Sequence, residues 1–243
     1  MNKNKNNLLI FLHIPKTAGT SLRKIVERQY SPNEIVSLYG FDSLEKQIGK
    51  YTSNDLRRKK CVLGHFQYGV HSHFSRPCNY VTMLRDPIDS LISLYYFVLQ
   101  NPNLPMYEQV KNKTFEEFIS NENVHNRLTW YLAGEDLPNL QKAKENLKDF
   151  QFVGVTEMFD ESVFLMKEKL GWGNVNYKKL NVTKNRPKIK EIPNDVIEKV
   201  MEKNQMDLEL YQYVKNSLKN EINALGHEST KALKAFKTSM QKR

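Results

Sequence analysis

The chain has 243 residues, 40% of them hydrophobic, a length and composition that suit one α/β domain with a sizeable core. Its formal net charge of +10 at pH 7 indicates an anionic partner, although the sequence carries no recognised nucleic-acid-binding motif. Two cysteines are too few for a disulfide framework. The longest apolar stretch near the start, residues 8–12, is far below the roughly 18 residues of a membrane span. Because no signal-peptide pattern precedes it, we expect a cytoplasmic protein without a membrane span.

The first predicted strand, residues 8–13, leads into the sequence HIPKTAGTS and then into an amphipathic helix at 20–30. A helix that starts here aims unpaired backbone N–H groups and the positive end of its dipole at one small volume. The ammonium group of Lys16 adds a positive charge to this volume, and the hydroxyls of Thr17, Thr20 and Ser21 add hydrogen-bond donors. The segment therefore predicts an anion-binding turn, with an ordinary βα turn and a solvated lysine as the alternative. The Walker A pattern is absent, which disfavours an ATP or GTP hydrolase.

A short apolar strand is expected at 61–64, and His65 follows at its exit. A lone histidine is more often a structural hydrogen-bonding residue than a catalyst. His65 lies between two segments that predict phosphate binding, which favours a functional role. Two further histidines, His71 and His73, lie near Cys78, but their spacing does not match a zinc site.

The next predicted strand, 80–84, ends in the sequence RDP. Asp86 suits the N-cap and Pro87 the first turn of a helix over 87–100. Arg85 then lies at the carboxyl end of a strand, where open α/β sheets bind ligands. Ser93 comes about two turns after the cap on the same helix face, so Arg85 and Ser93 could hold one phosphate together.

The second half of the chain contains a predicted strand at 152–156 and a helix at 160–170 that ends at Gly171. The polar loop LNVTKNRP, residues 180–187, has the composition of a surface linker. The stretch 102–113, with two prolines and few apolar residues, reads as a loop that could gate a cleft.

Strands that alternate with helices indicate a three-layer α/β fold with a central, mostly parallel sheet flanked by helices. Thr114 is expected to cap one helix, and Asn194 or Asp195 to cap another. The other predicted helices cover residues 43–50, 114–121, 140–148 and 194–220.

We expect a single domain over 1–243, with a disordered start at 1–7 and a basic tail at 227–243. Five Lys or Arg residues against one Glu make this tail a solvated segment that could be helical, with nonspecific anion contact as the alternative.

Two of these motifs resemble the signatures of one enzyme family. IPKTAGTS resembles the 5′-phosphosulfate loop of the sulfotransferases that use 3′-phosphoadenosine 5′-phosphosulfate (PAPS), most closely the carbohydrate branch that includes heparan sulfate 2-O-sulfotransferase and bacterial relatives. RDPIDSLISLYYF resembles the 3′-phosphate signature, in which an arginine and a serine at this spacing bind the phosphate. The resemblance spans roughly residues 8–215 and implies a P-loop-like fold. It implies that the donor is bound by Lys16, Thr17, Ala18, Gly19, Thr20, Ser21, Arg85 and Ser93.

The same resemblance assigns further roles. Gly64-His65 matches the place of the family's catalytic base, whereas Leu63 stands where the heparan branch has another histidine. A loop at 180–187 closes over the nucleotide in the family, which makes Thr183 and Arg186 candidate contacts. The segment NRLTWYLAG, residues 126–134, resembles a part of the family that could line the acceptor cleft, although packing explains its apolar residues equally well.

The resemblance implies sulfuryl transfer from PAPS to a hydroxyl of a saccharide or glycan by in-line displacement. A neutral imidazole is a natural base near neutral pH, so His65 would take the hydroxyl proton, and Lys16 would stabilise charge on the leaving bridging oxygen. No metal is expected. Two alternatives stay open: a P-loop nucleotide kinase-like phosphotransferase, and a non-catalytic module that binds an anionic polymer through its basic surface.

Overall fold

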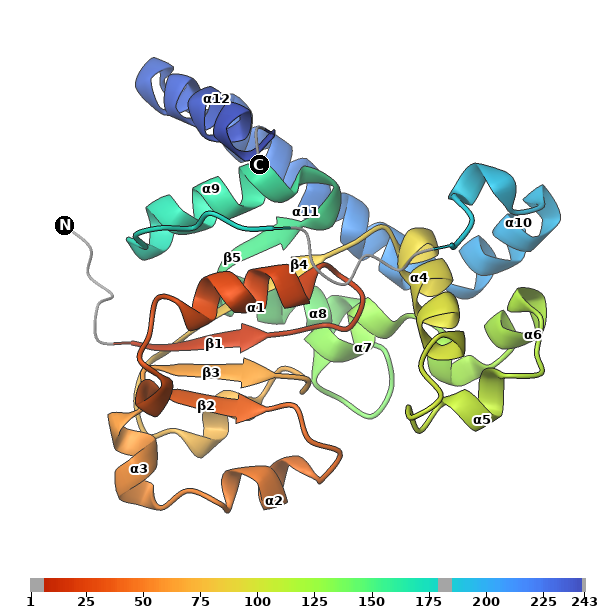
Figure 1. The fold of residues 1–243 in the computed structure, drawn as a ribbon, viewed down its shortest axis with the longest axis horizontal. Helices are drawn as coiled ribbons and strands as arrows, with labels where there is room; N and C mark the ends of the chain where they lie inside the picture. Colours follow the sequence, from red (N-terminus) through yellow and green to blue (C-terminus); the bar gives the residue numbers. More distant parts are fainter. Residues whose placement is uncertain (1–6, 179–184, 242–243) are drawn as a thin grey trace.

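A parallel five-stranded sheet forms the centre of the protein (Figure 1). The computed structural model describes residues 7–178 and 185–241. Within them the strand order is β2-β3-β1-β4-β5, and every neighbouring pair is parallel. The strands are β1 (Leu8–Leu12), β2 (Ile35–Leu38), β3 (Cys61–Gly64), β4 (Cys78–Leu84) and β5 (Phe150–Val155).

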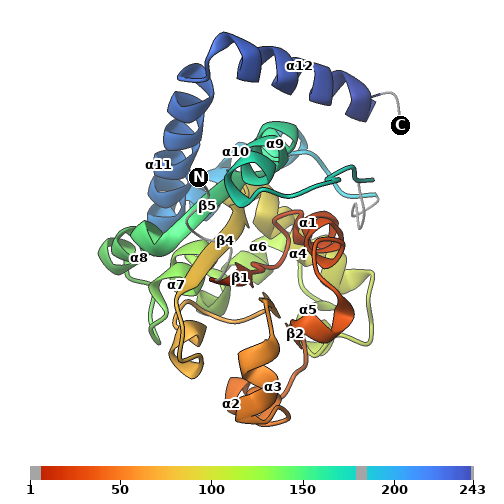
Figure 2. The same ribbon diagram turned by 90° about the vertical axis from the view of Figure 1, so that its left-hand side faces the viewer.

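Helices cover both faces of this sheet. Figure 2 shows α1 and α9 on one face and α7, α8 and α11 on the other. The α/β prediction of a central parallel sheet between helical layers is therefore confirmed, and the chain has a P-loop-like fold. The helices of the described residues are α1 (Gly19–Glu27), α2 (Leu44–Ile48), α3 (Ser53–Arg58), α4 (Pro87–Leu99), α5 (Tyr107–Val110), α6 (Phe115–Ile119), α7 (Arg127–Ala133), α8 (Leu140–Asn146), α9 (Phe159–Leu170), α10 (Asn194–Lys203), α11 (Gln205–Asn223) and α12 (His227–Gln241).

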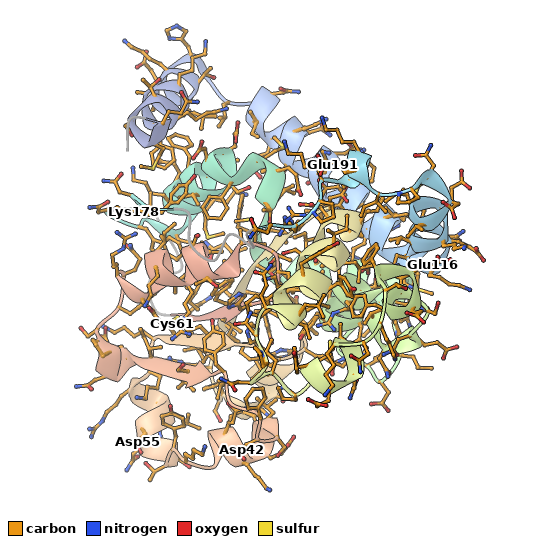
Figure 3. All side chains as sticks on the ribbon, turned by 45° about the vertical axis from the view of Figure 1, so that its right-hand side comes forward. Asp42, Asp55, Cys61, Glu116, Lys178 and Glu191 are labelled. Carbon is orange, nitrogen blue, oxygen red and sulfur yellow. The ribbon has the colours of Figure 1, made fainter. Side chains whose placement is uncertain are left out.

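Burial explains which strands the sequence predicts well. All five residues of β1 are buried, because the strand lies in the middle of the sheet with helices on both faces. The edge strand β2 was missed: Ile35 is half-buried and Ser37 is exposed, so this short segment lacks a continuous apolar run. Figure 3 shows Cys61 of β3 in the interior of the protein. Asp42 and Asp55, from the connection between β2 and β3, lie at the periphery.

Two helix predictions need correction. The helix expected over 194–220 is two helices, α10 and α11, because the chain breaks at Asn204. The side chain of Asn204 is buried and accepts a hydrogen bond from the backbone N–H of Asn126, 2.9 Å away, so a tertiary contact fixes this break. Neither Asn194 nor Asp195 caps α10, whose N-cap position is Pro193. The predicted cap at Thr114 is confirmed, since its side chain accepts from Glu117 N.

A second apolar cluster lies beside the carboxyl ends of the strands. It joins α4, α5, α6 and α10, which Figure 1 shows together beyond the strand arrowheads. The stretch 102–113, expected to be a plain loop, contains α5 and buries Val110 in this cluster. The cluster thereby holds α4, the helix of the RDP motif, from the side that faces away from the sheet.

The two ends of the described chain also differ from expectation. Asn7, expected in a disordered start, donates a hydrogen bond to Asn79, 3.1 Å away, at the beginning of β4. The basic segment from 227 is helix α12, which buries Leu233, packs Phe236 on Phe164 of α9 and pairs Lys237 with Glu161. The segment is helical over 227–241, and apart from these contacts most of its residues are exposed. None of the helices described is long and apolar enough to span a membrane.

Candidate functional site

The carboxyl ends of all five strands meet at one edge of the sheet, because the strands are parallel. Each strand is followed there by a polar residue or a polar segment. These are the loop 13–21 after β1, Tyr39 after β2, His65 after β3, Arg85 after β4 and Thr156 after β5. The topology thus brings together the two motifs and the histidine that the sequence analysis selected.

The loop after β1 has the strained geometry of an anion-binding turn. Lys16 and Ala18 both have positive φ, 70° and 60°, in the left-handed region that L residues rarely adopt. Helix α1 begins at Gly19 without a side-chain cap, and the N–H of Ser21 in its first turn donates to the carbonyl oxygen of Ala18 over 3.1 Å. The positive end of the helix dipole points into this loop. The hydroxyl of Thr17, expected to face the anion, is instead buried and donates to the carbonyl oxygen of Ile14 over 2.8 Å. Thr17 therefore shapes the turn.

Neighbouring strands hold this loop in place. Arg85 Nη1 donates to the carbonyl oxygen of Lys16 over 3.0 Å. The hydroxyl of Thr156 lies 2.9 Å from the carbonyl oxygens of both Thr17 and Leu84. The loop is thus fixed from the ends of β4 and β5, which keeps its first-turn N–H groups at one position.

Lys16 contributes a half-buried cation. Its Nζ lies 3.6 Å from the ring centroid of Phe97 on α4. Burial, together with the positive charges of Arg85 and Arg186, lowers its pKa to about 8. A bound anion would reverse this shift, because an opposite charge favours the protonated amine.

Two arginines from distant segments converge on one carboxylate. Arg85 Nε donates to Asp89 over 2.8 Å, and Arg186, from the loop after α9, contacts both oxygens of Asp89 at 2.5 and 3.2 Å. Burial alone would raise the pKa of Asp89, but the hydrogen bonds and charges of Arg186 and Arg85 hold it below its ordinary value. Asp89 was not selected from the sequence, because its partner Arg186 is 97 residues away. Ser93 is buried one turn beyond Asp89 on α4.

Asp86 begins α4 as predicted. Its side chain accepts from the N–H groups of Ile88 and Asp89, and its own N–H donates to Glu157 over 3.0 Å. Glu157 also accepts from the hydroxyl of Tyr211 and so is part of this support. Thr183 lies outside the described residues.

His65 is oriented by two backbone contacts. Its N–H donates to the carbonyl oxygen of Leu38, and its Nδ1 lies 2.6 Å from the carbonyl oxygen of His13. A carbonyl can only accept, so Nδ1 carries the proton and Nε2 has the lone pair. The side chain is exposed at its outer surface, yet the protein around its inner face desolvates the ring and lowers its pKa. His65 is therefore a neutral imidazole with a basic Nε2 at neutral pH.

Some residues of the segment 126–134 pack in the core, and another lies beside the candidate site. Leu128 and Leu132 are buried in the core, whereas Arg127 lines a small cavity between the loop and α4, together with Lys16 and Ser90. Asp207 of α11 also borders this cavity.

Asp207 fixes the start of α7 by accepting from the N–H groups of Leu128 and Thr129 at 2.9 and 2.7 Å. Burial raises its pKa to about 6.

The other histidine considered from the sequence has a structural role. His71 Nδ1 lies 2.9 Å from the hydroxyl of Tyr80. In the described parts of the chain, no group of three or more His, Cys, Asp or Glu side chains could hold a metal ion.

Comparison with known proteins relates this site to one family. A model of the sulfotransferase family matches residues 1–214. Mouse galactose-3-O-sulfotransferase 3 is 24% identical over 243 residues, covering 86% of this chain and 56% of the relative. Human heparan sulfate 2-O-sulfotransferase 1 is 24% identical over 205 residues, covering 70% of this chain and 56% of the relative. The chain thus spans just over half the length of these two curated relatives.

A crystal structure of a sulfotransferase from Alicyclobacillus acidocaldarius is also similar, with 15% identity and a TM-score of 0.49 over 85% of this chain and 94% of that one. The family match covers most of the chain, including the loop 13–21, His65 and the Arg85–Ser93 motif. The chain belongs to the sulfotransferase family.

Proposed function

We propose that this protein is a PAPS-dependent sulfotransferase that transfers the sulfuryl group to a hydroxyl of a carbohydrate. The observation that carries the proposal is the convergence of Lys16, Arg85 and Arg186 beside the N-terminus of α1. Arg85 and Arg186 share one carboxylate, Asp89. Three cations and one carboxylate leave a local excess of positive charge, which suits a ligand with several anionic groups.

The residues present fit the two charged ends of PAPS. The positive-φ turn at Lys16 and Ala18 and the uncapped start of α1 suit the 5′-phosphosulfate. Arg85 and Arg186, one turn from Ser93, suit the 3′-phosphate through forked contacts. Lys16 and the residues to Ser21 are proposed as the 5′ contacts on this basis, with Thr17 acting through its backbone.

The proposed chemistry divides between two side chains. PAPS supplies the sulfuryl group, with adenosine 3′,5′-bisphosphate (PAP) as leaving group. His65 removes the acceptor proton at Nε2, because Nδ1 is already protonated and held by the His13 carbonyl. Lys16, with the first-turn N–H groups of α1, stabilises the negative charge on the departing bridging oxygen.

A carbohydrate acceptor is supported by the relatives, which are named for galactose and heparan sulfate. The cytoplasmic location stays a prediction.

Calorimetric titration with PAP, AMP and ATP tests the nucleotide site. We expect PAP to bind far more tightly than either, since a charged, partly buried hydrogen bond is worth ~1.5–3 kcal/mol. Transfer of labelled sulfate from PAPS to a panel of glycans then tests the activity. Equal affinity for ATP would favour the kinase-like alternative, and PAP binding without transfer to any glycan would contradict the carbohydrate acceptor.

A further inference from the structure

His13 is the last residue before the anion-binding loop, and it lies beside His65. Its N–H donates to the carbonyl oxygen of Gly64 over 2.9 Å, which extends the pairing of β1 with β3 by one residue. That extension sets the two imidazoles next to each other, with ring centroids 4.5 Å apart and planes tilted by 50°. His13 is 6% exposed, whereas His65 reaches the surface.

Contacts on several sides fix the ring of His13. Its Nδ1 lies 2.8 Å from the hydroxyl of Tyr39, and its face stacks on Phe11 with centroids 5.2 Å apart. A Cβ added to Gly19 would lie 2.0 Å from Cδ2 and Nε2 of His13, so the ring sits directly against the start of α1. The imidazole therefore has little freedom to rotate.

Tyr39 completes the arrangement. Its ring meets His65 edge-on at 4.8 Å and His13 at 5.4 Å, and the guanidinium carbon of Arg23 lies 4.2 Å from its centroid. His65 is thus enclosed on its inner side by His13 and Tyr39, while its outer side stays exposed.

The charge of His13 matters for proton transfer. Burial lowers its pKa well below the ordinary value, and the positive charges of His65 and Arg23 lower it further. Arg23 and Arg127 also lower the pKa of His65. A neutral His13 tolerates an imidazolium on His65, whereas a charged one would oppose proton uptake there.

We infer that His13 is a positioning residue for the His65 base. The inference rests on the proposed function. The His13 carbonyl selects the His65 tautomer with its lone pair on Nε2, and the His13 ring holds the His65 imidazole in one orientation. The imidazole of His13 reaches the base from the neighbouring strand β1, because the pairing of His13 with Gly64 aligns the two residues.

The test compares two substitutions at this position. In His13→Ala the ring is lost, and we expect kcat to fall by roughly 10- to 100-fold, since small misplacements of a reacting group cost rates of this order. PAP affinity should stay unchanged, because the loop keeps its contacts to Arg85 and Thr156. His13→Phe retains a ring of similar shape and should recover most of the lost kcat.

Tyr39→Phe is the milder variant and carries the test if His13→Ala does not fold. It removes only the hydroxyl on His13 Nδ1, so we expect a smaller fall in kcat at constant PAP affinity. His71→Ala is the control, because His71 makes the same kind of contact to a tyrosine hydroxyl away from this edge. Nitrogen-15 spectra of the histidines should show the His65 proton on Nδ1 in the wild type.

Full kcat in both His13→Ala and Tyr39→Phe would overturn the inference. So would a joint loss of PAP affinity and kcat that His13→Phe does not recover, because that result assigns His13 to the anion loop. These outcomes differ from failure of the proposed function, in which the wild type itself neither prefers PAP nor transfers sulfate.

Discussion

The two halves of the carboxyl edge are built from opposite electrostatics. Around β4 and β5 the site is charged: Arg85 and Arg186 pair with Asp89, and their positive charges act on Lys16. Around β2 and β3 the two imidazoles are neutral, because burial lowers the pKa of His65 and of His13. Fixed cations suit the binding of an anion whose charge persists, whereas a neutral imidazole suits a proton that must be taken up. The difference assigns binding to one half and proton transfer to the other.

Removing the neutral base should have the largest effect and tests whether proton transfer and PAP binding depend on different residues. His65→Ala should lower kcat by roughly 10²–10⁴-fold, the usual scale for loss of a general base. PAP affinity should be almost unchanged, because the cations lie on the other half. Rapid-quench assays with labelled PAPS and calorimetry measure the two quantities.

The exposed His73 provides a matched control for that experiment. His73→Ala should leave both quantities unaltered. Near-normal transfer by His65→Ala would remove this histidine from the mechanism.

The charged half is tested by its arginines. Arg85→Ala should weaken PAP binding by an amount equivalent to ~1.5–3 kcal/mol, about 10- to 150-fold, because a charge-assisted contact to phosphate is lost. Ser93→Ala, which removes a neutral hydroxyl, should weaken it less. Calorimetry with PAP and with AMP measures both effects.

If Arg85 reads the 3′-phosphate, its removal should reduce PAP affinity much more than AMP affinity. Equal losses for the two nucleotides would contradict that assignment. Arg58→Ala, on the exposed side of α3, serves as the control for a general loss of positive charge.

The protonation of Lys16 should make PAP binding depend on pH. Its pKa of about 8 in the ligand-free protein means that the amine is charged below pH 8 and loses its proton above it. An anion raises this pKa on binding, so PAP affinity should fall as the pH rises through about 8. Titrations from pH 6.5 to 9.5 measure the slope.

Lys16→Arg keeps the charge at all these pH values and should abolish that slope. A slope that persists in Lys16→Arg would assign the titration to another group.

The smallest expected effect concerns the neutral half. The charge of Arg23 lowers the pKa of His65, so Arg23→Gln should raise it. Since the base must be unprotonated, the acid limb of the pH–rate profile should move to higher pH. Lys24→Gln is the control, because Lys24 pairs with the same Glu27 as Arg23 does but is not one of the charges that lower the pKa of His65. An acid limb that stays in place, or moves to lower pH, would contradict the link between Arg23 and the base.

Local patterns predicted those parts of the molecule that local sequence determines. The strands β1, β3, β4 and β5 follow from their apolar runs, and the cap at Thr114 follows from cap chemistry. The edge strand β2 does not, because Ser37 faces solvent and the segment is only four residues long. The break at Asn204 is set by its contact with Asn126, which no sequence window contains.

The site residues also fall into those that a local motif predicts and those whose roles depend on long-range contacts. The motifs pointed to the loop 13–21, His65 and Arg85, because their residue types are characteristic of a family. Asp89 and His13 stand inside the quoted motifs, yet their contacts depend on Arg186 and Tyr39 from elsewhere in the chain. Tyr39 follows the strand that was missed, so its contact with His13 could not be anticipated.

One structure would test the division of the edge most directly: a crystal structure of this protein with PAP bound. We expect the 3′-phosphate to contact Arg85 and Arg186, the 5′-phosphate to lie on the loop 16–21, and His65 Nε2 to face the 5′-phosphate across an open acceptor position. A nucleotide bound with its 3′-phosphate away from both arginines, or with His65 turned away from the 5′-phosphate, would contradict it.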